Sequence, residues 1–311
     1  KELQALKATL DYDLLVADDE LTPRQQRTLE QELQVRVLDR TALILDIFAH
    51  QARTREGKLQ VELAQHRYLL PRLVGRWEHL ERLGGGIGTR GPGESQLETD
   101  RRIIRTHIAR LEKDLAAVGR HREVHRSRRR REGIPLVALV GYTNAGKSTL
   151  FNTLSQAGVS AEDRLFSTLD PVTRRIRLPG GKMILMTDTV GFINKLPPSI
   201  VAAFRTTLEE LDEADLLLHV VDITHPDAAR QDSAVEHILA DIGLGAKRII
   251  TALNKADLLE TKDEAMPLLH EKLDSSRADF VAVSAVTGWH TRELLEQIES
   301  VLESVDSAQV S

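Results

Sequence analysis

The chain contains no cysteine, few aromatic residues and no long apolar run. Without cysteine, disulfide bonds and thiolate metal sites are excluded. No apolar stretch approaches the roughly 20 residues of a membrane-spanning helix, and no signal peptide is recognisable, so we expect a cytoplasmic protein without a membrane span. Although aromatic residues make up only 4% of the 311 residues, 41% are hydrophobic, which is enough for packed cores in about two domains. Because the chain begins at Lys1 within a helical pattern, we expect a fragment.

The net charge of −5 conceals one strongly basic segment. Residues 101–131 contain 11 arginines and 1 lysine against 3 acidic residues, a surplus of +9, so the remainder carries −14. Such a run can simply be solvated, but four consecutive arginines exceed what a helix end requires, and phosphate contact is the better use. No aromatic residue interrupts the tract, which favours contact with an RNA backbone over base stacking. We expect RNA contact from Arg126, Arg128, Arg129 and Arg130.

The first 40 residues predict the C-terminal part of a small α/β domain. Residues 14–17 and 35–38 have the pattern of short strands. Between them, Thr22 followed by Pro23 predicts the start of a helix that ends near Leu33.

Residues 41–132 predict a helical hairpin with a basic linker. Apolar residues recur at helical spacing from about residue 47 to 83, with Pro71 as a kink, and again from 97 to 118. Between these arms, residues 83–94 contain six glycines in twelve positions. A flexible turn would explain them, but a turn needs far fewer residues, so we favour a tip that orders on a partner and carries Arg90.

An eight-residue motif, Gly-Tyr-Thr-Asn-Ala-Gly-Lys-Ser at 141–148, fits the P-loop pattern. The apolar run 134–140 precedes it and a helical pattern follows, which is the strand–loop–helix context the motif requires. Backbone N–H groups would surround the phosphates, Lys147 would reach the β- and γ-phosphates, and Ser148 would bind Mg²⁺. The predicted phosphate-binding residues are Gly141, Tyr142, Thr143, Asn144, Ala145, Gly146, Lys147, Ser148 and Thr149.

The remainder of the second domain, 133–304, alternates predicted strands with predicted helices. Strands are predicted at 175–178, 182–186, 216–221, 248–253 and 280–283, and helices at 199–211, 227–240, 263–273 and 291–302. This order predicts an α/β fold with a mostly parallel sheet, and the turn at 178–182 predicts one antiparallel edge. Residues 305–311 are expected to form a tail.

Three of these strands end in polar segments suited to a guanine nucleotide. Asp188-Thr189-Val190-Gly191 could hold the water shell of magnesium and contact a γ-phosphate. After the strand predicted at 248–253, Asp257 can accept hydrogen bonds from the guanine ring N–H and amine. The Lys255 stem can cover the base, and Asn254 can brace the phosphate loop. Backbone N–H groups at Ser284 and Ala285 could meet the guanine carbonyl. The combination predicts that GTP and GDP bind at this edge.

The motifs GYTNAGKS, DTVG, NKAD and SA resemble the translation-factor-related class of P-loop GTPases. Longer strings resemble the HflX family of ribosome-associated GTPases: RTALILDIFAHQARTREGKLQVELAQ, GGIGTRGPGESQLETDRR and FSTLDPVTR. The resemblance implies a nucleotide-binding-like N-terminal part, a helical hairpin and a GTPase domain. It also implies binding to the large ribosomal subunit and its rRNA, with GTP-regulated splitting or rescue of ribosomes and the hairpin tip near the peptidyl-transferase centre. We expect a monomer.

The same resemblance assigns roles in hydrolysis. Thr168 would be the switch-one threonine that completes the Mg²⁺ shell, while Asp188 and Gly191 belong to switch two; Lys147, Thr168 and Gly191 are the expected catalytic residues. Phe192 stands where Ras-like proteins place glutamine. Because a phenyl ring cannot orient water, we expect slow hydrolysis that the ribosome stimulates.

Two questions stay open at the level of sequence. The side chain of Asn144 could help to bind K⁺ beside the phosphates, or it could make a simple loop hydrogen bond. The protein could also be a GTP-gated rRNA-binding or assembly factor in which hydrolysis is incidental. An ATP-driven enzyme is disfavoured by Asp257.

Overall fold

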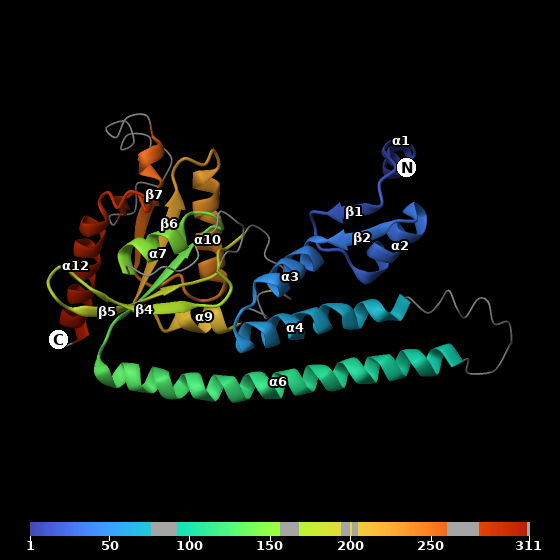
Figure 1. Cartoon of the computed structure of the whole chain (residues 1–311), viewed down its shortest axis with the longest axis horizontal. Coiled ribbons are helices and arrows are strands. Elements are labelled where there is room, and N and C mark those ends of the chain that lie inside the picture. The colour runs from blue at the N-terminus through green and yellow to red at the C-terminus, as the bar shows by residue number, and fades with distance from the viewer. Residues whose placement is uncertain (76–91, 156–167, 194–199, 201–204, 260–279, 310–311) are drawn as a thin grey trace. The chain divides into compact units, whose positions relative to one another are not determined.

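The structure is a computed structural model of the 311-residue chain (Figure 1). It describes all residues except 76–91, 156–167, 194–199, 201–204, 260–279 and 310–311. The described part divides into two compact units, one formed by residues 1–123 and the other by residues 124–196 and 205–311. Among the described helices, none combines the length and apolar character that a bilayer span requires.

The first unit combines a two-stranded parallel sheet with helices. Strands β1 and β2 pair from Leu14 opposite Arg36 to Ala17 opposite Asp39. Thr22 forms a capping box with Gln25 at the start of the intervening helix, as the sequence predicts. The elements are α1 (Glu2–Leu10), β1 (Leu14–Ala17), α2 (Pro23–Leu33), β2 (Arg36–Asp39), α3 (Arg40–Gln51), α4 (Arg55–Leu69), the 3₁₀ helix η1 (Leu70–Gly75) and most of α6 (Pro92–Glu132).

A fully buried carboxylate, Asp39, joins β2 to the helices of this unit. One oxygen accepts hydrogen bonds from the Ala42 backbone N–H and the Tyr68 hydroxyl, both at 2.8 Å. The other accepts from the Leu21 N–H at 3.1 Å and pairs with the Arg72 guanidinium at 3.0 Å. That guanidinium also stacks on the Tyr68 ring, 3.5 Å from its centre. Burial, reinforced by the hydrogen bond to Asp39, raises the pKa of Tyr68, so the hydroxyl remains a donor.

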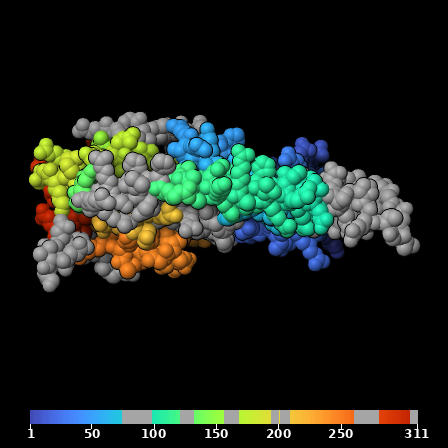
Figure 2. Space-filling view, turned by 90° about the horizontal axis from the view of Figure 1, so that it is seen from below, coloured from blue at the N-terminus to red at the C-terminus, as the bar shows by residue number. Residues whose placement is uncertain are grey.

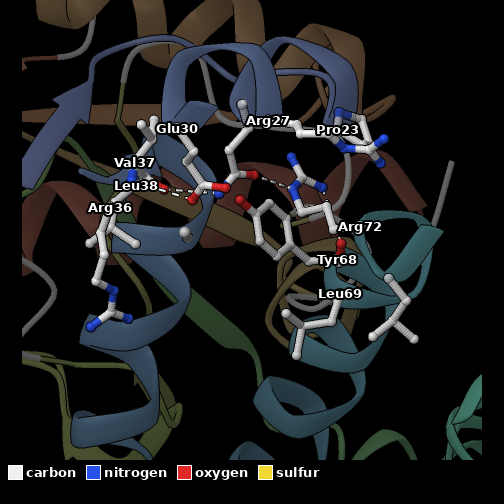
Figure 3. A pocket seen from close by; sticks show the side chains of 12 residues that line it. Pro23, Arg27, Glu30, Arg36, Val37, Leu38, Tyr68, Leu69 and Arg72 are labelled. Carbon is white, nitrogen blue, oxygen red and sulfur yellow. Dashed lines mark hydrogen bonds between the residues drawn. The ribbon is translucent and has the colours of Figure 1, made fainter. Parts of the chain in front are cut away.

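A cavity of about 260 Å³ lies beside this cluster (Figure 3). Tyr68 and Arg72 line one side of it, and β2 lines the opposite side. The Val37 carbonyl accepts from the Gln26 side chain at 2.8 Å, and the Val37 N–H donates to Glu30 at 3.4 Å. Side chains of α2 therefore satisfy the backbone of β2 where no further strand pairs with it among the described residues.

The sequence predicts a continuous helical arm over residues 47–83, but the structure divides its first part into separate helices. Helix α3 ends at Gln51, and Thr54 caps a separate helix, α4, by accepting a hydrogen bond from the Gly57 N–H at 2.9 Å. The α-helix then tightens into η1, which contains Pro71. Proline lacks the N–H that an α-helix needs at an interior position, so the ladder ends there rather than kinking.

The second arm, α6, is one helix of 41 residues, and Figure 2 shows it, teal to green, on the face in view. The predicted apolar stripe is its more buried side: Leu111 is buried, and Ile104, Ile108, Leu115 and Val118 are half-buried. Arg67 of α4 pairs with Glu112 at 2.6 Å, and the rings of His66 and His107 stack with centres 5.7 Å apart. These contacts hold the arms together, whereas the predicted glycine-rich tip lies outside the described residues.

The expected boundaries after residues 40 and 132 stay predictions. In the compact units, residues 1–40 group with the helices that follow, and Asp39 bonds to α3, α4 and η1 as well as belonging to its own sheet. The second division falls within α6, a helix that passes from one unit to the other.

The second unit is a six-stranded sheet with helices on both faces, which confirms the predicted fold class. The strand order is β4-β5-β3-β6-β7-β8; β4 and β5 are antiparallel, and the other neighbours are parallel. Its elements are β3 (Leu136–Gly141), α7 (Lys147–Ser155), β4 (Val172–Arg177), β5 (Met183–Asp188), α9 (Arg205–Asp212), β6 (Leu216–Asp222), α10 (Ala228–Asp241), β7 (Ile249–Asn254), the 3₁₀ helix η2 (Ala256–Leu258), β8 (Phe280–Ala282) and α12 (Thr291–Gln309).

Burial on both faces explains why β3 and β6 are apolar along their length. Every residue of these two strands is buried. One core contains side chains of α7 and α12, and the opposite core contains side chains of α9 and α10. The predicted hairpin at 178–182 is present, with Gly181 at φ +96°. The predicted helix at 263–273 lies outside the described residues. The carboxyl ends of the parallel strands meet at one edge, where the site lies.

Asp39→Ala should destabilise the first unit by about 3–5 kcal/mol, because it removes the carboxylate that pairs with the largely buried Arg72 guanidinium and accepts from the Tyr68 hydroxyl. Asp18→Ala is the matched control. It breaks the Asp18–Arg40 pair, in which the Asp18 side chain is 88% exposed, and should cost less than about 1 kcal/mol. Hydrogen exchange of the α3 and α4 amides measures both. Equal protection in the two variants would contradict the role of Asp39.

Candidate functional site

The loop 141–148 connects β3 to α7 at the carboxyl edge of the sheet, as the motif predicts. Two of its glycines are required by close backbone approach. A Cβ on Gly141, at φ +148°, would lie 2.3 Å from the carbonyl oxygen of Val220 in β6. A Cβ on Gly146, at φ +91°, would lie 2.2 Å from the side-chain nitrogen of Asn254. The loop therefore packs against the neighbouring strands with no space for larger residues.

Asn144 is exposed, and its backbone lies in the left-handed region at φ +63°. Asparagine tolerates this conformation better than most side chains. The backbone thus supplies one reason for asparagine at this position, independent of any cation.

Lys147 is buried and points back into its own loop. Its Nζ donates to the carbonyl oxygens of Gly141 at 3.2 Å and Tyr142 at 2.8 Å. Burial lowers the pKa of Lys147 to about 8, although the carboxylate of Asp188 opposes this effect. A Cβ on Gly191 would lie 2.9 Å from the same Nζ. Lys147 and Gly191 therefore face one space, as expected for two groups that contact a γ-phosphate.

Three oxygen atoms converge beside this lysine. Ser148 Oγ lies 2.7 Å from Thr168 Oγ1, and both hydroxyls donate to Asp188 Oδ2, at 2.6 and 2.7 Å. The other carboxylate oxygen of Asp188 is buried, and no group of the described residues forms a hydrogen bond with it. Burial raises the pKa of Asp188, against the hydrogen bonds from Ser148 and Thr168 and the charge of Lys147. Hard oxygen donors around an unsatisfied carboxylate fit Mg²⁺, the ion that the sequence predicts here.

The backbone after Asp188 is bonded to the phosphate loop. The Thr189 hydroxyl donates to the Leu139 carbonyl of β3. Phe192 N–H donates to the Gly141 carbonyl at 3.0 Å, and Thr143 N–H donates to the Phe192 carbonyl at 2.8 Å. The Phe192 side chain is 3% exposed and lies in the core with Leu136, Leu211 and Leu239. Its ring is thus part of the fold and does not orient water.

Asn254 braces the phosphate loop, as the sequence predicts. Its amide nitrogen donates to the Ala145 carbonyl at 2.9 Å, and its oxygen accepts from the Ala285 N–H at 2.9 Å. We had expected the Ala285 N–H to meet the guanine carbonyl, whereas the structure gives this donor to Asn254. Ser284 is buried and accepts a hydrogen bond from the Thr287 N–H at 3.1 Å.

Asp257 lies in η2 and is exposed, so its carboxylate is accessible to a base. Lys255 precedes it in the left-handed region at φ +68°. Of the other predicted residues, Val190 is buried and Thr149 is half-buried in α7. Arg126, Arg128, Arg129 and Arg130 belong to α6, and Arg90 lies outside the described residues. Contact of these arginines with RNA stays a prediction.

Two residues at this edge are absent from the sequence-based prediction. Asp222 ends β6 and lies with Oδ2 2.7 Å from the Lys255 ammonium. Thr153 of α7 donates to the Ala285 carbonyl at 2.6 Å. Asp222 could have been found, because it is a polar residue at the end of an apolar strand like Asp188 and Asn254. Thr153 gives no such signal within its helix.

Comparison with known proteins agrees with this geometry. Three family models match successive segments: GTP-binding GTPase N-terminal at 1–49, GTP-binding GTPase Middle Region at 51–129, and 50S ribosome-binding GTPase at 136–255. The GTPase HflX of Lacrimispora saccharolytica is 52% identical over 295 residues, which cover 95% of this chain and 68% of that protein. The GTPase HflX of Caldanaerobacter subterraneus is 54% identical over 260 residues, which cover 84% of this chain and 61% of that protein.

A solved structure with a similar fold is the GTP-binding protein of the archaeon Sulfolobus solfataricus in complex with GDP. It has a TM-score of 0.53 and 27% sequence identity, and the match covers 98% of this chain and 85% of that chain. The present chain spans between 61% and 68% of the length of the two bacterial relatives.

Nucleotide affinity should fall as the pH rises through the pKa of Lys147. Phosphates beside Nζ raise that pKa above its nucleotide-free value of about 8, so binding takes up a proton at higher pH. Between pH 7.5 and 9.0 the Kd for GDP should rise by up to about tenfold per pH unit above that pKa, the limit that linkage to one proton sets. Titration calorimetry at pH 8.5 in buffers of different ionisation enthalpy should show net proton uptake of up to about one proton.

Lys147→Arg provides the control, because a guanidinium stays charged across this range. Its affinity can be weaker, but its Kd should not change between pH 7.5 and 9.0. A pH-independent Kd in the unmodified protein would contradict the assignment.

Proposed function

The chain belongs to the HflX family of GTPases, and from this premise we propose that it binds the large ribosomal subunit and couples GTP hydrolysis to the splitting or rescue of ribosomes. The observation that carries the chemical part is the convergence of Ser148, Thr168 and Asp188 beside the P-loop. The ribosomal part is supported by the match to the 50S ribosome-binding GTPase model and by the basic tract of α6.

Each described element of the edge has a part in nucleotide binding. The loop 141–148 would surround the phosphates, with Lys147 leaving its two carbonyl acceptors for the β- and γ-oxygens. Ser148 and Thr168 would hold Mg²⁺, with Asp188 acting through its water shell. The bound ion supplies positive charge against the phosphate oxygens. Asp257 would select guanine, since its carboxylate can accept from two donors that adenine does not present together.

The protein would switch conformation through the two residues that the γ-phosphate would hold in place. Thr168 and Gly191 would be held by GTP and released after hydrolysis, as in other switch regions. Gly191 lies next to Lys147 and precedes Phe192, whose backbone bonds to Gly141 and Thr143. A displacement of Gly191 would therefore also move the phosphate loop.

Hydrolysis by the protein alone would be slow. Phe192 is buried in the core, so the position that carries glutamine in Ras-like proteins offers no polar group to the attacking water. A group supplied by a partner can raise the rate by about 10³–10⁵ in such enzymes. The ribosome is the proposed partner, and the protein would act in the cytoplasm as a monomer.

The arginines of α6 would contact rRNA, and residues 76–91 connect the two arms of the hairpin in sequence. In the alternative, GTP only gates attachment to rRNA during assembly, and hydrolysis is incidental. The two functions differ in turnover on intact ribosomes and in the release of subunits.

Large ribosomal subunits should stimulate GTP turnover by at least about tenfold, because they would supply the polar group for the attacking water that Phe192 lacks. Small subunits serve as the control and should have little effect. Co-sedimentation should be stronger with a non-hydrolysable GTP analogue than with GDP, and light scattering of intact ribosomes should report splitting. Turnover that is unchanged by large subunits would contradict the catalytic proposal, and stimulation without splitting or rescue would favour the assembly factor.

The rRNA contact can be tested in the same assay. Replacing Arg128, Arg129 and Arg130 by glutamine should weaken co-sedimentation and reduce its dependence on salt, because fewer counterions are released from RNA. Arg292→Gln is the control, since Arg292 pairs with Glu296 at 3.1 Å within α12.

GTP turnover on ribosomes should be faster in K⁺ than in Na⁺ salts if Asn144 helps to hold a monovalent ion. The ion would add positive charge beside the phosphates in the transition state. Asn144→Asp is a suitable comparison, because aspartate also tolerates the left-handed backbone at φ +63°. Equal rates in the two salts would remove the potassium proposal and leave Asn144 with its backbone role alone.

A further inference from the structure

Asp222 lies at the end of β6, directly opposite Asn254 at the end of β7. The Ile223 N–H donates to the Asn254 carbonyl at 3.2 Å, so the two strand ends are bonded to each other. Asp222 is therefore adjacent to residues 254–257, the segment that would recognise guanine.

The carboxylate of Asp222 is fixed from two sides. Its Oδ1 accepts hydrogen bonds from the Thr224 backbone N–H at 3.0 Å and from the Thr224 hydroxyl at 2.6 Å. Its Oδ2 lies 2.7 Å from the Lys255 ammonium. Burial raises the pKa of Asp222, but the hydrogen bonds from Lys255 and Thr224 hold it below its ordinary value. Thr224 thus orients the carboxylate independently of Lys255.

The side chain of Lys255 has many rotamers unless a partner such as Asp222 holds its end. Its backbone is left-handed at φ +68°, a conformation that non-glycine residues adopt mainly where the surroundings require it. Its side chain is 26% exposed, although a lysine stem has many rotamers when its end is free. The ion pair selects one of these rotamers and holds the four-carbon stem in place at the base-binding segment.

We infer that Asp222 is a positioning residue that holds the Lys255 stem where it covers the face of the guanine ring. The inference rests on the proposed function, because it assumes that guanine lies against residues 254–257. Asp222 would act through Lys255 and touch neither the nucleotide nor Mg²⁺. Its effect should therefore be the same for GDP and GTP, which share the base and ribose.

Asp222→Asn tests the inference, because asparagine keeps the size and the acceptor for Thr224 but loses the charge facing Lys255. The Kd for GDP and for GTP should each rise by about tenfold, the upper range for ordering one long side chain on binding. Faster dissociation should account for the change. Turnover at saturating GTP should stay within about twofold, since the phosphate end is unaltered. Stopped-flow measurements with fluorescent GDP and GTP analogues give these values.

Asp215→Asn is the matched control, at the residue immediately before the same strand. Asp215 precedes β6 at the opposite edge of the sheet, where its carboxylate accepts from the Leu136 N–H at 2.7 Å. This variant should bind GDP and GTP as the unmodified protein does. Its melting temperature shows what an aspartate-to-asparagine change with a lost charge does to the fold.

Lys255→Met provides the second test, because it keeps a long apolar side chain without the ammonium. It should weaken GDP binding about as much as Asp222→Asn, and adding Asp222→Asn to it should cause no further loss, as expected for two residues in one interaction. Unchanged GDP affinity in Asp222→Asn, or an equal loss in the Lys255→Met background, would overturn the inference. If the unmodified protein bound neither GDP nor GTP, the proposed function itself would fail.

Discussion

The nucleotide-binding edge depends on the two hydrogen bonds of the Asn254 side chain. They join loops that lie 109 and 31 residues away along the chain, through the Ala145 carbonyl and the Ala285 N–H. Gly146 is a consequence of this contact, because a Cβ there would overlap the Asn254 amide. The phosphate loop, the base-recognition segment and the loop after β8 are thus placed by one buried amide whose position the sheet fixes. Because these segments are already held in place, less of the binding free energy is lost in ordering the protein when the nucleotide binds.

Buried carboxylates at the ends of parallel strands recur in both units, and their partners distinguish their roles. Asp39 ends β2 and has both oxygens satisfied by two backbone donors, a tyrosine and an arginine, so it stabilises a fold. Asp188 ends β5 and keeps one buried oxygen that no described residue satisfies, an arrangement that is costly unless an ion or water completes it. Asp222 ends β6 and pairs with Lys255, the lysine that we propose covers the base. An aspartate at the end of a strand thus has a structural role at Asp39, and metal-related and positioning roles in the proposals for Asp188 and Asp222.

Much of the second unit was predictable because its signals are local. Apolar runs bounded by glycine and polar residues marked five of the six strands, whereas β4 (Val172–Arg177), with three arginines, was predicted only in part, at 175–178 beside the turn. The motifs at the strand ends marked the Ser148, Asp188 and Asn254 regions. The partner of the Ala285 N–H was not predictable, because Asn254 lies 31 residues away and only the folded sheet brings its side chain to this N–H. In the first unit, helical spacing alone could not show the break before Thr54, since the apolar pattern continues across it. The roles of Asp39 and Thr153 were also hidden, because their partners are distant in sequence and bring no motif of their own.

Phe192 connects these points to catalysis. Its ring belongs to the core between the sheet and α9 and α10, while its backbone bonds to Gly141 and Thr143 at the start of the phosphate loop. A polar side chain at this position would have to leave that core to reach water, and the lost burial would weaken the attachment of switch two. The large buried side chain instead ties the segment after Asp188 to the fold, and it offers no polar group to an attacking water. Because Gly191 immediately precedes it and lies against Lys147, the γ-phosphate would still be sensed at a firmly held point. Such a site agrees with the proposed function, in which hydrolysis would be slow until a partner supplies the missing group.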